Sequence, residues 1–110
     1  MKSNAFRSFI EEQLADIPAL KVRHMFSGFG IYSGEVFFGI IHKETLYFRA
    51  NDRTKKRYED SGMTFFTAPG SKKALKNYYE VPLPVLEHRR KLAEWARESI
   101  EAANESIQPQ

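Results

Sequence analysis

The sequence predicts an α+β fold with two layers, in which an antiparallel sheet of four to five strands packs against helices. Apolar residues recur at helical spacing near both ends of the chain, and the middle divides into short β-rich runs bounded by glycine and turn residues. No tract rich in Pro, Gly or Ser separates these segments. We therefore expect one domain over residues 1–110, with an ordered core over about residues 3–103.

The composition supports a packed core and excludes several classes of site. The chain is 42% hydrophobic and 14% aromatic, which is enough apolar surface for a domain of 110 residues to fold by packing alone. It contains no cysteine, which excludes disulfides, thiolate nucleophiles and cysteine-based metal centres. No run of about 18 apolar residues occurs, so we expect a cytoplasmic protein without a membrane segment.

The first element expected is an amphipathic helix that ends before Pro18. Its apolar positions follow helical spacing and are Phe6, Phe9, Ile10, Leu14 and Ile17. From residue 22 to residue 32 the pattern changes to one extended segment, which is interrupted by Gly28 and Gly30. These glycines predict a bulge or a close approach of another backbone, because a dinucleotide-binding loop would need a third glycine and a helix directly after it.

Two more strands and a short helix are expected to follow. Ser33-Gly34 marks a turn, and residues 36–41 and 45–50 are apolar or alternating runs joined by residues 42–44. Three consecutive antiparallel strands are the simplest interpretation. Asn51 or Asp52 can then accept hydrogen bonds from the first free amides of a helix over residues 53–60, which Gly62 ends in a left-handed conformation.

The last third of the chain predicts one or two strands and a final helix. Strands are expected over residues 63–67 and 77–81, with a turn at Pro69-Gly70 and a loop or helical turn over residues 72–76. Pro84 suits the first turn of a helix whose apolar stripe continues from Leu86 to about Ala103. The full order is helix, three strands, helix, one or two strands, helix.

Residues 23–32, Arg-His-Met-Phe-Ser-Gly-Phe-Gly-Ile-Tyr, resemble the glycine-bearing strand signature of the TfoX N-terminal domain family. That signature reads Met-Phe-Gly-Gly, then an aromatic residue, Gly, Ile and Tyr, and Ser27 stands here where the family usually has its first Gly. Further matching pieces follow in the same order up to a Leu-x-x-Trp at residues 92–95. The residues that carry this structural signature are Met25, Phe26, Gly28, Gly30, Tyr32, Gly62 and Trp95.

The resemblance implies a non-enzymatic binding domain of the kind found in bacterial regulators of competence and transcription. Such a domain would act through protein contacts, either with a partner or as a homodimer. The competence regulators that give the family its name carry a second, C-terminal domain, which we do not expect in this chain. The residues themselves offer no catalytic constellation, since neither a Gly-x-Ser-x-Gly nor a His-Glu-x-x-His motif occurs. His24, His42 and His88 share no metal-ligand spacing, so we expect no catalytic residue, cofactor or metal.

Two basic clusters suggest an alternative function, the weak binding of nucleic acid. Their cationic side chains would contact phosphates while Tyr78 and Tyr79 stack on exposed bases, although strand alternation turns at least one of the two inward. The clusters lie at 53–57 and 72–76 and comprise Arg53, Lys55, Lys56, Arg57, Lys72, Lys73 and Lys76. A third basic run occupies residues 89–91. The competing interpretation is that all three are solvated helix and loop faces, which agrees with a formal net charge of only +3.

An aromatic set allows a similar choice between core and interface. It comprises Phe37, Phe38, Tyr47, Phe48 and Trp95. These side chains either fill the core or, where strand alternation sends them away from the helices, form an exposed patch for a protein partner.

Overall fold

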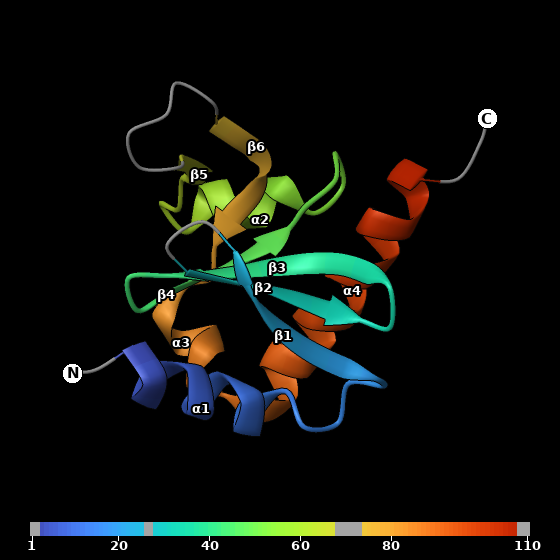
Figure 1. Cartoon of the computed structure of the whole chain (residues 1–110). Coiled ribbons are helices and arrows are strands. Elements are labelled where there is room, and N and C mark those ends of the chain that lie inside the picture. Colours follow the sequence, from blue (N-terminus) through green and yellow to red (C-terminus); the bar gives the residue numbers. More distant parts are fainter. Residues whose placement is uncertain (1–2, 26–27, 68–73, 108–110) are drawn as a thin grey trace.

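The computed structural model describes residues 3–25, 28–67 and 74–107, and within them it confirms the predicted α+β class. The helices are α1 (Ser3–Gln13), α2 (Lys55–Asp60), α3 (Leu83–Leu86) and α4 (Arg89–Ile107). The strands are β1 (Leu20–Met25), β2 (Gly28–Ser33), β3 (Val36–His42), β4 (Thr45–Arg49), β5 (Phe65–Thr67) and β6 (Ala74–Glu80). They form one antiparallel sheet in the order β1-β2-β3-β4-β6-β5 (Figure 1).

The described sheet has six strands, whereas four or five were expected, because residues 22–32 form two strands and not one. Met25 at the end of β1 pairs with Gly28 at the start of β2, so the chain reverses its direction between them. The sequence hides this reversal, since the intervening Phe-Ser is not one of the glycine- or asparagine-containing pairs typical of hairpin turns.

The main core lies between one face of the sheet and the helices α1, α3 and α4 (Figure 1). The first and last helices were expected to cover the sheet in this way. Phe38 and Phe48 are completely buried on the sheet side. The helices contribute Ile10, Val85, Leu92 and Ala96, and Leu14 adds to the core directly after α1. The buried hydroxyl of Ser99 on α4 donates to the carbonyl oxygen of Phe38 at 2.8 Å, so this polar group is satisfied inside the core.

A second, smaller core lies on the other face, because the sheet curls toward that side. The ring of Phe66 on β5 lies 5.0 Å from the ring of Tyr47 on β4 and 5.4 Å from that of His42 on β3. β5 and β3 are three positions apart in the sheet, about 14 Å if it were flat. Only a strongly curled sheet brings these rings together. The cluster also contains Ile40 and Tyr78.

The ends of α2 follow the local signals in the sequence. The side-chain oxygen of Asn51 accepts hydrogen bonds from the amides of Arg53 at 3.0 Å and Thr54 at 2.9 Å, and the helix begins after this turn at Lys55. Gly62 has a φ of +80°. Its amide donates to the carbonyl of Glu59, and the next amide donates to that of Tyr58, as in a Schellman motif.

The C-terminal half departs from the prediction in two places. The expected single helix is divided into α3 and α4, because the ring of His88 accepts a hydrogen bond from the amide of Lys91 at 3.2 Å and starts a new helix. The expected loop over residues 72–76 is also wrong for its last part, since Lys76 lies within β6. The turn predicted at Pro69-Gly70 falls outside the described residues.

Candidate functional site

The basic side chains of α2 and of the turn before it all lie near carboxylates of the same chain. Arg53 donates to Glu105 on α4 at 2.9 Å, and Arg57 donates to Glu98 on the same helix. The two lysines form longer pairs closer in sequence, Lys55 with Asp52 at 3.8 Å and Lys56 with Asp60 at 3.5 Å. The first predicted basic cluster is therefore largely neutralised, and its two arginines connect α2 and the turn before it to α4.

Arg57 is held on both sides by α4. Its guanidinium lies 4.1 Å from the ring centroid of Trp95, and Trp95 packs edge-on against Tyr58 at 4.9 Å. Burial raises the pKa of the Tyr58 hydroxyl above its ordinary value. Tyr58 and Trp95 thus form the apolar part of the α2–α4 contact, and the ion pair with Glu98 lies at its edge.

The second predicted cluster is only partly visible, because Lys72 and Lys73 lie outside the described residues. Lys76 is exposed on β6. Tyr78 and Tyr79, which would have stacked on bases, are both buried. Tyr79 faces the main core and donates to Glu59 at 3.1 Å, whereas Tyr78 stacks on Phe37 in the smaller core. The interpretation of these tyrosines as exposed stacking groups is wrong.

The aromatic set also divides between the two faces of the sheet. Phe38 and Phe48 belong to the main core, whereas Phe37 and Tyr47 pack half-buried against the smaller one. The core interpretation therefore holds for the first pair. Burial raises the pKa of Tyr47, and the nearby carboxylate of Glu80 raises it further.

Most of the signature residues lie on and around β2. Gly28 starts this strand, where an added Cβ atom would lie 2.1 Å from the carbonyl oxygen of Ile41 on β3. Gly30 faces the side chains of Met25 and Tyr32, and the ring of Tyr32 also stands 5.3 Å from that of Phe37. Phe26 lies outside the described residues. The glycines of β2 thus admit close neighbours on either side of the strand.

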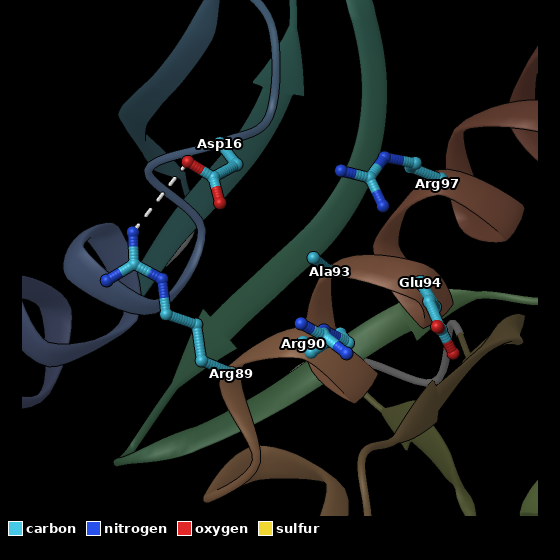
Figure 2. A pocket seen from close by; sticks show the side chains of 6 residues that line it. All are labelled: Asp16, Arg89, Arg90, Ala93, Glu94 and Arg97. Atoms are coloured by element: carbon cyan, nitrogen blue, oxygen red, sulfur yellow. Dashed lines mark ion pairs between the residues drawn. The ribbon is translucent and has the colours of Figure 1, made fainter.

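One cleft lined by charged side chains was not revealed by the sequence. It has a volume of about 570 Å³ and lies between the connection that follows α1 and the first half of α4 (Figure 2). Its lining residues are Asp16, Arg89, Arg90, Ala93, Glu94 and Arg97. We call it the arginine cleft. The run at residues 89–91 is a sequence signal for part of it, but nothing local connects that run to Asp16 or to Arg97.

Within the arginine cleft the cations are only weakly paired. Arg89 reaches Asp16 at 3.8 Å, and both side chains are exposed. Arg90 and Arg97 form no hydrogen bond or ion pair with the part of the chain that the structure describes. Figure 2 shows these two arginines on either side of the buried Ala93. The small side chain of Ala93 leaves the hollow open between them.

Two further observations concern metals and membranes. Over residues 3–25, 28–67 and 74–107, no group of three or more His, Cys, Asp or Glu side chains is placed to hold a metal ion. Within those same ranges, no helix combines the length and apolar character that are needed to cross a membrane.

Comparison with known proteins gives a match to one family model. No curated protein matches the chain. The model of the TfoX N-terminal domain matches residues 12–103, which include the six described strands and the packing of Tyr58 on α2 against Trp95 on α4. A match over most of the chain, together with the fold expected from the same resemblance, shows that this chain belongs to the TfoX N-terminal domain family.

Proposed function

We propose that this chain is a non-enzymatic regulatory domain that acts by contacting another protein. Its role would be the control of competence and transcription that the family resemblance implies, and its location the cytoplasm. Family membership supports the regulatory part of the proposal. The observation that carries the protein contact is the distribution of charge: the cations around α2 are paired within the chain, whereas Arg90 and Arg97 face an open cleft.

The same distribution favours a protein over a nucleic acid as the partner. Phosphate binding uses cations that can displace the counterions of the nucleic acid. Arg53 and Arg57 would first have to leave Glu105 and Glu98, and these two carboxylates would then stand next to the phosphates. The nucleic-acid alternative stays a prediction, and the following experiment includes it as an outcome.

The proposal is tested by capture of a partner from native extract on the tagged full chain, with and without nuclease. We expect one captured protein to survive nuclease treatment and to bind again, once purified, in a calorimetric titration. Lys76→Ala serves as the control, since this exposed lysine belongs to the predicted nucleic-acid cluster and should not affect the protein contact. Light scattering on the purified chain shows whether the contact is a homodimer.

Besides a failure to capture any protein, two results would contradict the proposal. One is a capture that nuclease abolishes. The other is binding to a DNA duplex of about 20 base pairs that weakens by orders of magnitude between about 50 and 200 mM salt, as expected for many phosphate contacts. If Lys76→Ala also reduced the binding of the DNA duplex, the function of the chain would be to bind nucleic acid.

A further inference from the structure

We propose that the arginine cleft receives an acidic segment of the protein partner, whose carboxylates pair with Arg90 and Arg97. This inference rests on the proposed function, because it names the chemistry of the partner and the place where it binds. The argument uses the shape of the cleft, the state of its arginines and the position of its two carboxylates.

The shape allows side chains to enter. The cleft has a volume of about 570 Å³, within the usual range for sites that hold groups the size of several side chains. Ala93 forms its floor and is only 5% exposed. Arg90 and Arg97 are separated by two helical turns, about 10 Å along α4. In an extended peptide, side chains two residues apart on one face are about 7 Å apart, so two of them fit between arginines that lean toward Ala93.

The arginines are available for new hydrogen bonds. Each guanidinium carries five N–H donors in a planar fork, which matches the two oxygens of a carboxylate. Arg90 and Arg97 have no such partner among the described residues, and both side chains are exposed. The pair between Arg89 and Asp16 is long and solvated, so it stabilises the chain little and can open.

The carboxylates of the cleft favour a protein segment over a phosphate backbone. Asp16 and Glu94 stand among the three arginines, so the lining carries a small excess of positive charge. A nucleic acid presents a continuous row of negative charges and would meet both carboxylates. A peptide of mixed sequence can instead place acidic side chains on Arg90 and Arg97 and a basic or neutral one near Asp16 or Glu94.

The test uses NMR spectra of the ¹⁵N-labelled full chain with defined probes. The probe is a capped peptide of alternating Glu and Gly, about eight residues long and therefore roughly 25 Å when extended. The control probe has Gln in place of Glu. At low ionic strength we expect the Glu peptide to shift the backbone amides of residues 89–97 and the side-chain Nε–H signals of Arg90 and Arg97. The Gln peptide should leave them unchanged.

Three variants assign the effect to individual side chains. We expect Arg90→Ala and Arg97→Ala each to weaken the binding of the Glu peptide about fivefold to tenfold, since each removes a charge-assisted pair. Lys91→Ala removes the same charge from the same helix outside the cleft lining, and it should change the affinity less than twofold. The dispersion of the spectra shows that each variant remains folded.

Several outcomes would overturn the inference. These are equal shifts from the Gln peptide, shifts centred on residues 53–57 or on Lys76, no shift at millimolar peptide, or an equal loss in Lys91→Ala. If a DNA duplex shifted the amide signals of residues 89–97 as strongly as the Glu peptide does, the arginine cleft would be a nucleic-acid site. If a nuclease-resistant partner is captured equally well by Arg90→Ala and Arg97→Ala, the cleft inference fails and the proposed function remains. If the peptide binds but no protein is captured, the proposed function fails.

Discussion

Gly28 and Gly30 lie two residues apart on β2, and an added methyl group would meet different neighbours at the two positions. At Gly28 the new Cβ would lie 2.1 Å from the backbone carbonyl oxygen of Ile41, which cannot move without distorting the β2–β3 pairing. At Gly30 the closest atom is the sulfur of Met25 at 2.9 Å, at the flexible end of a side chain. The same substitution therefore has unequal costs.

We predict that Gly28→Ala lowers the free energy of unfolding by about 2–3 kcal/mol, because the clash with the backbone of β3 forces it to shift. Gly30→Ala should lower it by less than about 1 kcal/mol, since Met25 can rotate away. Urea unfolding followed by circular dichroism measures both values. If both variants lost the same free energy of unfolding, the close approach of the β3 backbone would not be the reason for a glycine at position 28.

A second prediction at the residue scale concerns Glu105. Hydrogen bonds from Arg53 and then Asn51 hold the pKa of this carboxyl below its ordinary value. Because the folded pKa lies below the unfolded one, the ionised carboxylate favours the folded state at pH values above the unfolded pKa. That contribution is lost as the pH falls through the folded pKa. Arg53→Met should therefore raise the pKa of Glu105 and reduce the loss of stability in acid.

An NMR titration of the glutamate carboxyl carbons measures the pKa of Glu105 directly. Lys56→Met is the matched control, because Lys56 pairs with Asp60 and not with Glu105. A pKa of Glu105 that is the same in wild type and Arg53→Met would contradict the ion pair between Arg53, in the turn before α2, and Glu105 on α4.

At the scale of elements, the sequence predicts those features that depend on local chemistry. The turn that Asn51 stabilises before α2 and the left-handed Gly62 after it are of this kind, since each acts within a few residues of the helix. The break between α3 and α4 escaped prediction because Val85 and Leu92, which are seven residues apart, keep the apolar stripe in phase across it. The reversal between β1 and β2 escaped because the Phe-Ser sequence that joins them is not a pair typical of hairpin turns.

The candidate site shows the same limit. Arg89 and Arg90 are visible as a basic run, but the cleft exists only because the fold brings Asp16 to the same place. The internal pairing of Arg53 likewise needs Glu105, which is 52 residues away. Charge clusters read from a sequence show which side chains are present, whereas only the fold shows which of them remain available to a partner.

At the scale of the whole molecule, the single tryptophan reports on a contact that joins three elements. Trp95 on α4 packs against Tyr58 of α2, whose ring stacks on Tyr79 of β6 at 5.7 Å. We predict that Trp95 fluorescence and far-ultraviolet circular dichroism give the same unfolding midpoint in urea, because this contact belongs to the main core. A fluorescence transition at lower urea would show that α2 leaves α4 before the sheet unfolds.

The strand order also has a consequence for how other chains can attach. β1 and β5 form the two borders of the sheet, where backbone N–H and C=O groups would be open to a foreign strand. β1 carries Lys21 and Arg23 along its length, and β5 is only three residues long. The charges on β1 and the short length of β5 both disfavour the addition of a foreign strand, and with it aggregation. Recognition of another molecule by this domain must then depend on side chains, which evolution can alter one at a time.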